Sequence, residues 1–568
     1  MTRRIRSIAA FLAIIGSATA ADAVIVSPDT NLTAREQQII AAATPSAAPQ
    51  FHGPRIIGIY PDTPFLFCLA ATGRGPLRFS AKKLPHGLSL DPGTGIITGM
   101  LKQNGDYTFT ALAKNSTGAA RTSVKIACGD TLALTPPMGW NSYDAFGDSV
   151  VESEVVSNAL WLKKHLQPFG WDTIVVDFRW YDSLASGSRP QSNPEGVVID
   201  GFGRCIPAVN RFPSAAQGQG FRNLAGRIHA MGLKFGIHIM RGIPRKAVEK
   251  NLPIAGSVYT AAQAALPQGD INRASVWNND MYGVDATTAA GKAWYESIAR
   301  QYASWGVDYV KCDDIANMFR GRFYSADEVA TLSMALKTSG RSIVLSLSPG
   351  PTPINHFAHL EQFANLWRIS GDFWDNWKSL NHNFDLFAQW YQHGKPGHWP
   401  DGDMIPFGHI CQRNCDVHPD RWTRFTRDEQ LTLMSLWALA PSPLMIGANL
   451  PDNDRWTTAL LSNPGVLAVN QDANGQQGRR VGFTSSGAGV WTKKLSTGAL
   501  AAGFFNRSEK PLKVDYAWRN LNFPNAPLVR DLWIRQDLGR QSEFQAELPP
   551  HGCVLLLLTG APSSSSRP

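Results

Sequence analysis

Two segments of this chain each end a short apolar run in charged side chains. The first is Tyr309-Val-Lys-Cys-Asp-Asp314 and the second is Trp367-Arg-Ile-Ser-Gly-Asp372. In (β/α)8 enzymes the chemistry lies at the C-terminal ends of the barrel strands. The interval between the two segments has room for two βα units, so Asp313 and Asp372 can meet at one barrel mouth. Most enzymes that cleave glycosidic bonds need at least two carboxylates that face each other across the substrate. The pair Asp313 and Asp372 predicts that chemistry.

The first segment contains two candidate nucleophiles, Asp313 and Asp314. Lys311 and Asp313 are two residues apart, so both side chains leave the same face of a strand, whereas Asp314 leaves the other face. A lysine beside Asp313 would keep its carboxylate ionised, as a nucleophile requires. We therefore predict that Asp313 is the nucleophile.

The second segment supplies the candidate acid. Asp372 must begin protonated to assist the departing oxygen, and desolvation raises the pKa of a carboxyl group. Three nearby tryptophans are predicted to provide that apolar setting: Trp367, Trp374 and Trp377. Arg368 would act in the opposite direction if it came close.

Several other predicted strands also end in a polar or aromatic residue: Trp140, Asp177, His238, Arg368, Asp401 and Asp403. Each has a simpler explanation when taken alone. A lone aspartate after a strand is most often a helix N-cap, and a lone histidine in an apolar strand is usually a hydrogen-bonded core residue. Their shared position at strand ends is what predicts a common site.

The elements that would position these residues alternate between strands and helices from residue 131 to residue 475. Eight strand-like runs occur at 138–143, 173–177, 234–239, 309–313, 343–348, 366–370, 398–404 and 443–447. Helical patterns separate them, for example at 221–231 and 293–305. Eight strands alternating with helices predict a TIM barrel as the catalytic domain.

The segments on either side of the predicted barrel have the period-two pattern of β structure. Residues 51–130 predict an immunoglobulin-like β-sandwich, and residues 476–560 predict a C-terminal antiparallel β-sandwich. Residues 24–50 are rich in Ala, Ser and Pro and predict a loosely attached linker. The Ser-rich tail, 561–568, is predicted to be disordered.

Residues 1–23 have the three parts of a secretory signal peptide. Arginines at positions 3, 4 and 6 precede an apolar stretch at 8–15, and small residues at 18–23 offer a cleavage site. The apolar stretch is too short to span a bilayer, and no later run is long enough. We expect a periplasmic or secreted protein without a membrane span.

The composition is that of a globular protein of several domains, with 568 residues, 43% of them hydrophobic and 17% charged. The formal net charge of +9 includes the three arginines of the predicted signal peptide. The rest of the chain contains no long basic run, so the charge pattern does not suggest a nucleic-acid partner.

Six ordered motifs resemble those of the α-galactosidases of glycoside hydrolase family 27. They are Met138-Gly-Trp-Asn-Ser142, Val176-Asp177, Tyr309-Val-Lys-Cys-Asp313, Trp367-Arg-Ile-Ser-Gly-Asp372, Asp401-Gly-Asp-Met404 and Leu467-Ala-Val-Asn-Gln-Asp472. The resemblance covers residues 134–475 and the C-terminal β domain. Six motifs in one order and with matching spacing make a specific signal.

This resemblance implies a retaining hydrolase of terminal α-D-galactosides that works by double displacement and needs no cofactor or metal. It implies that Asp313 is the nucleophile and Asp372 the acid/base. The implied sugar-binding set, to which we add His238 from its strand-end position, is Trp140, Asp177, Lys311, Arg368 and Asp403. The expected partner is a carbohydrate, and the oligomeric state is left open.

Two positions depart from the family pattern. Members usually have two consecutive aspartates after the second strand, but here Asp177 is followed by Phe178. They usually have a Cys-Glu-Trp set after the fifth strand that contacts the sugar's 2-position, but here Ser348-Pro-Gly350 occurs. Both positions concern sugar recognition. Alternatives are therefore β-L-arabinopyranosides, α-glucans as in isomaltodextranases, or an inactive carbohydrate-binding barrel, although both catalytic carboxylates are retained.

The chain contains seven cysteines, an odd number that leaves at least one thiol free. Cys68 and Cys128 could bridge the two sheets of the immunoglobulin-like module, and two buried thiols are an equally good alternative. The segment 409–418 has two Cys and two His, but its spacing matches no common zinc site. A disulfide between Cys411 and Cys415 is the favoured prediction there.

Overall fold

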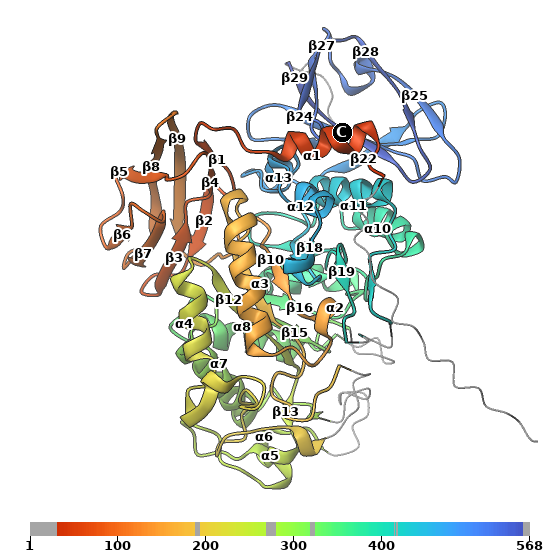
Figure 1. Cartoon of the computed structure of the whole chain (residues 1–568). Helices are drawn as coiled ribbons and strands as arrows, with labels where there is room; N and C mark the ends of the chain where they lie inside the picture. Colours follow the sequence, from red (N-terminus) through yellow and green to blue (C-terminus); the bar gives the residue numbers. More distant parts are fainter. Residues whose placement is uncertain are drawn as a thin grey trace, which may run out of the picture.

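The computed structural model describes residues 31–187, 194–267, 280–317, 324–413, 415 and 418–560. An immunoglobulin-like module, a (β/α)8 barrel and a C-terminal β-sandwich follow one another along the chain (Figure 1). This multidomain architecture confirms the predicted fold class. The predicted signal peptide and C-terminal tail lie outside the described residues.

The barrel is an eight-stranded parallel sheet, and every strand predicted from the sequence is present. In spatial order the strands are β18 (Trp399–Asp401), β17 (Leu366–Arg368), β16 (Val344–Leu347), β15 (Tyr309–Asp313), β12 (Lys234–Met240), β11 (Thr173–Val176), β10 (Met138–Asn141) and β21 (Leu444–Ile446). A parallel bridge between Ile405 and Ile446 closes the ring. The strands are short and almost wholly buried, as expected where helices cover a parallel sheet.

Helices surround this barrel in Figure 1. The longer ones are α3 (Glu152–His165), α4 (Arg222–Ala230), α7 (Ala289–Trp305), α8 (Ala326–Lys337), α9 (Phe357–Phe363), α10 (Trp377–Gln389) and α11 (Arg427–Leu439). The shorter ones are α2 (Tyr143–Phe146), α5 (Arg245–Glu249), α6 (Ala261–Ala264), α12 (Arg455–Leu461) and α13 (Pro464–Asn470). The Thr288 side chain caps the start of α7, and Gly306 ends that helix in the left-handed conformation that glycine adopts readily. None of the helices within the described ranges is long and apolar enough to cross a membrane.

The immunoglobulin-like module pairs two antiparallel-rich sheets. One contains β2 (Ile56–Ile59), β9 (Gly118–Cys128), β8 (Gly105–Asn115) and β5 (Arg78–Lys82), and the other β3 (Pro64–Cys68), β7 (Ile96–Met100) and β6 (Leu88–Leu90). A further pair consists of β1 (Gln50–Phe51) and β4 (Ala71–Thr72). The Tyr60 backbone N–H donates a 2.9 Å hydrogen bond to Ser342 Oγ, just before β16 begins. The module therefore packs at the N-terminal ends of the barrel strands, opposite the predicted mouth.

Of the two alternatives considered for Cys68 and Cys128, the structure has free thiols and no bridge between the sheets. All seven cysteines lie within the described residues, and all are free thiols. Along β3, Phe67 faces the core of the sandwich, so Cys68 faces away from it, whereas Cys128 belongs to that core. Strand pairing thus turns the two thiols in different directions.

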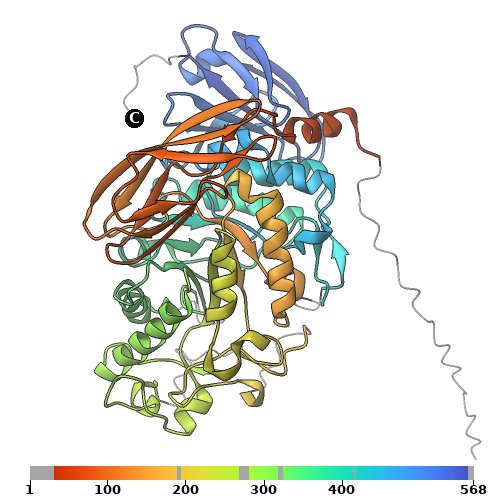
Figure 2. The same cartoon turned by 60° about the vertical axis from the view of Figure 1, so that its left-hand side comes forward.

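Residues 34–43, expected to be part of a loose linker, form helix α1 (Ala34–Ala43). Thr33 and Glu36 make a capping box at its start, which the sequence analysis overlooked. Ile39 is fully buried, and Glu36 forms a 2.7 Å ion pair with Arg427 of α11. Figures 1 and 2 both place α1 beside the C-terminal sandwich, so this segment joins parts of the chain far apart in sequence.

The C-terminal domain is built from two antiparallel sheets. The larger contains β22 (Arg479–Phe483), β23 (Gly489–Lys494), β24 (Leu500–Phe505), β29 (Cys553–Thr559), β26 (Leu528–Asp531) and β27 (Gln536–Arg540); the smaller pairs β25 (Leu512–Ala517) with β28 (Glu543–Leu548). Buried Lys493 donates hydrogen bonds from Nζ to the carbonyls of Val469 (2.5 Å) and Ala438 (3.3 Å). These carbonyls lie in the last turns of α13 and α11, where helix carbonyls have no partner within the helix. The sandwich is thus anchored to the barrel.

Deletion of residues 24–130 should leave hydrolysis of a small glycoside largely intact, because the immunoglobulin-like module packs at the end of the barrel opposite the mouth. The melting temperature should fall by about 5 °C or more, since the deletion exposes apolar surface that now packs on the module and α1. Steady-state kinetics and differential scanning calorimetry measure both effects. A shorter deletion of residues 24–45 isolates the contribution of α1. Loss of turnover by a folded 24–130 deletion would show that the module helps to build the site.

Candidate active site

Side-chain direction along the barrel strands decides which residues reach the mouth. An inward-facing apolar layer contains Val175, Tyr309, Leu366, Trp399, Met404 and Met445. Two positions further along four of these strands, on the same face, stand Asp177, Lys311, Arg368 and Asp401. Charged groups from separate strands are therefore gathered in one layer directly above an apolar floor.

Asp313 lies at the C-terminal end of β15, one inward position beyond Lys311. Its side chain is 19% exposed, and its Oδ2 lies 3.4 Å from Nε2 of His238 on the neighbouring strand β12. Burial alone would raise the pKa of Asp313. The hydrogen bond from His238 and the positive charges of His238 and Lys311 outweigh burial and lower the pKa. Asp313 is therefore held as a carboxylate at the mouth.

Two neighbouring carboxylates, the rival candidate Asp314 and Asp375, point elsewhere. Asp314 is buried, has a φ of 59°, and places Oδ2 3.6 Å from Nη2 of Arg241. Asp375 is also buried and forms an ion pair of 2.6 Å with Arg421. Each is therefore occupied by a buried arginine away from Asp313.

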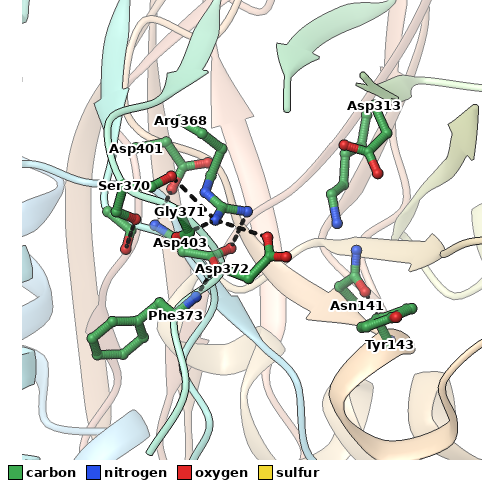
Figure 3. Close-up of polar contacts among 12 residues, drawn as sticks. Asn141, Tyr143, Asp313, Arg368, Ser370, Gly371, Asp372, Phe373, Asp401 and Asp403 are labelled. Atoms are coloured by element: carbon green, nitrogen blue, oxygen red, sulfur yellow. Dashed lines mark hydrogen bonds and ion pairs between the residues drawn. The ribbon is translucent and has the colours of Figure 1, made fainter. Parts of the chain in front are cut away.

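Asp372 reaches the mouth from the loop after β17. Its side chain is 68% exposed, and Oδ1 lies 3.3 Å from Nη2 of Arg368. The same Arg368 nitrogen donates a 2.6 Å hydrogen bond to the carbonyl of Gly371, while Nη1 forms a 2.7 Å ion pair with Asp403. Figure 3 shows the Asp372 carboxylate directed toward the side of the opening that carries Asp313 and Asn141. Arg368 thus organises the loop that presents Asp372.

The expected tryptophan lining around Asp372 is wrong for two of the three residues. Trp367 is fully buried and packs on Trp390, and Trp377 stacks on His551 of the C-terminal domain with ring centroids 3.7 Å apart. Trp374, two residues after Asp372, is partly exposed. The acid candidate is consequently open to solvent and not enclosed in an apolar pocket.

Asp177 is held by three hydrogen bonds or ion pairs at the end of β11. Lys311 Nζ lies 3.0 Å from Asp177 Oδ2, Asn141 Nδ2 donates to the same oxygen at 2.5 Å, and the Phe178 N–H donates to Oδ1 at 2.8 Å. Burial raises the pKa of Asp177, but the charges of Lys311 and His238 together with these hydrogen bonds lower it to about 2. Asp177 is therefore an ionised acceptor, and Lys311 pairs with it more closely than with Asp313.

Asp403 is the second carboxylate held by Arg368. Its Oδ2 accepts a 2.8 Å hydrogen bond from the Phe373 N–H, and its φ is 87°. Burial raises the pKa of Asp403 to about 6, an effect that the positive charge of Arg368 offsets only in part. Asp403 therefore links the loop after β18 to the loop that carries Asp372.

Trp140, predicted to contact the sugar, does not face the mouth. It is fully buried among the outer residues of the barrel, and its indole N–H donates a 2.7 Å hydrogen bond to the Ala448 carbonyl. Its neighbour Asn141 pairs in register with inward-facing Val175 and points inward instead. Asn141 was therefore not predicted from the sequence, because strand register decides which of the two adjacent side chains enters the barrel.

Tyr143 is a second residue missed from the sequence. It is partly buried in the first turn of α2, and its N–H donates to Asn141 Oδ1 at 2.9 Å. Figure 3 places Tyr143 beside Asn141 at the opening. Its aromatic side chain and its position two residues after a strand were the features of the sequence that could have identified it as a site residue.

The residues after Asp177 form a buried cluster beside His238. Phe178 packs edge-to-face on His238 with ring centroids 5.4 Å apart. Arg179 makes ion pairs of 3.1 Å with both Asp182 and Asp280, and all three side chains are at most 3% exposed. The groups that might have replaced the family's second aspartate are therefore committed to one another.

The loop after β16 packs tightly against the loop that carries Asp372. Ser348 is buried, and its carbonyl accepts a hydrogen bond of 3.2 Å from the Ile315 N–H. A Cβ at Gly350 would lie only 2.1 Å from the Ser370 carbonyl oxygen, so only glycine fits there. This close approach fixes one wall of the mouth.

The segment 409–418 was a candidate for a zinc site or a disulfide. Its described His and Cys side chains instead contact different neighbours. His409 places Nδ1 2.8 Å from Asp452 and Nε2 2.5 Å from Asp420. The Cys411 thiol accepts a 3.0 Å hydrogen bond from Arg421, and Cys415 is likewise a buried free thiol. The predicted disulfide is absent from the structure. Among the described residues, no group of three or more His, Cys, Asp and Glu side chains is arranged to hold a metal.

Comparison with known proteins relates most of the chain to described protein families. A family model described as "Alpha galactosidase A" matches residues 282–472, one described as "Alpha galactosidase C-terminal beta sandwich domain" matches 485–558, and an Ig-domain model matches 48–128. The α-galactosidase of Oryza sativa is 28% identical over 455 residues, covering 79% of this chain and 91% of the relative. Human α-galactosidase A is 26% identical over 461 residues, covering 75% and 89%.

A solved structure is more similar still. The family 27 β-L-arabinopyranosidase from Geobacillus stearothermophilus is 44% identical, with a TM-score of 0.72, over 76% of this chain and 98% of that one. Identity at this level over nearly the whole of the relative shows common ancestry, and it agrees with the motif series read along the barrel. The chain belongs to glycoside hydrolase family 27 and is a glycoside hydrolase.

Proposed function

We propose that this enzyme hydrolyses terminal glycosides by double displacement with retention of configuration. Asp313 attacks the anomeric carbon while Asp372 gives its proton to the glycosidic oxygen, so the C–O bond breaks and the leaving group departs as an alcohol. A water molecule then attacks the glycosyl–Asp313 ester. Asp372 takes its proton, and the free sugar and the original carboxylate result. The chain's own residues supply every step.

The charge arrangement supports these two roles. Asp313 is held ionised by His238 and Lys311, which suits a nucleophile. Asp372 is exposed at the opposite side of the opening, where it can meet both a leaving group and an incoming water molecule. Arg368 holds the loop of Asp372 through backbone carbonyls, so the carboxyl group is positioned before substrate binds.

For the sugar, we propose β-L-arabinopyranosides as the preferred substrates and α-D-galactopyranosides as the second candidate. The two sugars share ring configuration and differ by the exocyclic hydroxymethyl group of galactose. The observation that carries the preference is Phe178, which replaces an acid beside Asp177 while Arg179 and Asp182 are locked together. A carboxylate–hydroxyl hydrogen bond contributes about 1.5–3 kcal/mol, and phenylalanine cannot make it. The similarity to the Geobacillus arabinopyranosidase favours the same sugar, and the α-galactosidase relatives favour the second.

The sugar is tested by comparing 4-nitrophenyl β-L-arabinopyranoside and α-D-galactopyranoside on one enzyme preparation. We expect kcat/KM to favour the arabinoside by less than about a hundredfold, corresponding to under ~3 kcal/mol. Phe178→Asp should move the ratio toward the galactoside, and Phe178→Leu serves as the matched apolar control. A galactoside preference in the wild type would contradict the role given to Phe178. Activity on an α-glucoside above both would indicate a glucan-cleaving enzyme.

We also propose that the protein is exported, on the strength of the signal-like residues 1–23. N-terminal sequencing of the protein from its native host should find a chain that begins at or soon after residue 21. A mature protein that retains Met1 would contradict export by this route.

A further inference from the structure

The segment after Asp372 alternates between exposed and buried side chains. Asp372 is largely exposed, Phe373 is buried, Trp374 is partly exposed and Asp375 is buried. Phe373 packs on Phe425 and Trp437 in the core. Asp372 and Trp374 both reach the surface and are separated by a single buried residue, so the indole lies close to the acid/base candidate along the chain.

Trp374 is held in place although it is not buried. The guanidinium of Arg421 lies 5.7 Å from the centre of its ring, and the His418 ring meets it edge-on at 4.8 Å. Arg421 is itself fixed by two hydrogen bonds to Asp375, of 2.6 and 3.1 Å. The backbone N–H of Arg424 donates to Asp375 as well, at 2.8 Å. The aromatic surface is thus oriented in advance, which lowers the entropy cost of binding against it.

The proton transfer determines which part of a substrate meets this surface. An acid/base residue protonates the oxygen between the sugar and the leaving group, so the leaving group lies beyond Asp372 on its outer side. Trp374 is the partly exposed aromatic side chain that follows Asp372 most closely in the chain. Flat aromatic surfaces bury ring-shaped partners through large apolar contact with little loss of side-chain freedom. The weakly polar faces of sugar rings suit such a surface.

We propose that Trp374 is the platform of the leaving-group subsite, and that the natural leaving group is a sugar unit whose apolar face stacks on the indole. This inference rests on the proposed function, because it uses Asp372 as the acid. It makes the enzyme one that trims terminal sugars from oligosaccharides or polysaccharide side chains. Simple alkyl glycosides would then use only half of the site.

The test compares two substrates that carry the same terminal sugar, a methyl glycoside and a disaccharide. Both leaving groups are alcohols of similar acidity, so both need the same help from Asp372. We expect Trp374→Ala to lower kcat/KM for the disaccharide about tenfold and for the methyl glycoside less than about twofold, in the range of aromatic stacking. Trp374→Phe should restore most of the loss, because it keeps an aromatic face.

Trp422, which follows Arg421 on strand β20 (Arg421–Trp422), offers a matched control. It is also partly exposed, but it stacks on His409, so Trp422→Ala should leave the ratio of the two rates unchanged. An equal fall for both substrates in Trp374→Ala would show that Trp374 only supports the loop, and would overturn the subsite. Unchanged rates for both would overturn it too. Failure of the wild type on both substrates would instead refute the proposed function itself, and the platform with it.

Discussion

Asp313→Asn is expected to abolish turnover of every glycoside, whatever its leaving group. The amide is a poor nucleophile, so the covalent intermediate does not form, and acid assistance from Asp372 cannot replace it. Loss of a residue that forms the covalent bond typically lowers kcat by ~10⁴-fold or more. Steady-state rates with an activated aryl glycoside, measured on protein shown to be folded by circular dichroism, provide the result.

The neighbouring carboxylate supplies the control for this prediction. Asp314→Asn makes the same chemical change one residue later, but at a buried side chain directed toward Arg241. We expect its folded protein to retain turnover and to have a lower melting temperature, since a charge interaction in the interior is weakened. Wild-type-like activity in Asp313→Asn, or loss of activity in a folded Asp314→Asn protein only, would reverse the assignment.

Removal of Asp372 should slow substrates according to their leaving groups. In Asp372→Ala, kcat/KM for methyl glycosides and disaccharides should fall by about 10²–10⁴-fold, because an alkoxide departs poorly without a proton. Glycosides with acidic phenols should lose much less in the first step, and their glycosyl–enzyme intermediate should accumulate. Burst kinetics would reveal that accumulation.

Azide provides a direct test of the missing base. It attacks the intermediate without needing deprotonation, so added azide should restore turnover of the aryl glycoside by Asp372→Ala and give a glycosyl azide of retained configuration. Asp420→Asn, which alters a carboxylate 42% exposed near His409, is a control that should behave as the wild type. Equal losses for all leaving groups, without azide rescue, would exclude Asp372 as the acid/base.

These two experiments separate the carboxylates from the groups that orient them. Arg368 contacts Asp372 and Asp403 together, and Lys311 contacts Asp177 at 3.0 Å. Loss of either cation would therefore disturb several side chains at once, and its kinetic effect would report positioning rather than one chemical step. The carboxylate variants are the cleaner test of mechanism for this reason.

Most of the barrel could be predicted because its signals are local. Eight short apolar runs, each followed by a polar residue, recur with helical patterns between them, and strand, helix and turn preferences over such windows depend on nearby residues alone. The direction of Lys311 and Asp313 to one face also follows from the chain, since side chains alternate along any strand. Helix α1 is the exception: its capping box is equally local, but the Ala-, Ser- and Pro-rich composition around it is typical of a linker.

The errors at the site concern contacts between distant segments. Trp140 and Asn141 are adjacent, and only the pairing of Asn141 with Val175 shows which one enters the barrel. Trp377 was expected beside Asp372, but it stacks on His551, far along the chain in the C-terminal domain. Cys68 faces away from Cys128 because of how two sheets are stacked.

The sequence by itself determined the fold class, the family and the two carboxylates proposed for catalysis, because strand ends, alternation and motif order are properties of the chain. Tertiary structure decided which side chains contact one another at the site. It paired Lys311 with Asp177, placed His238 beside Asp313, left Asp372 exposed, and locked Arg179 to Asp182 and Asp280. Burial and through-space charge depend on where separate elements come to lie, and these quantities set the ionisation and the recognition at the site.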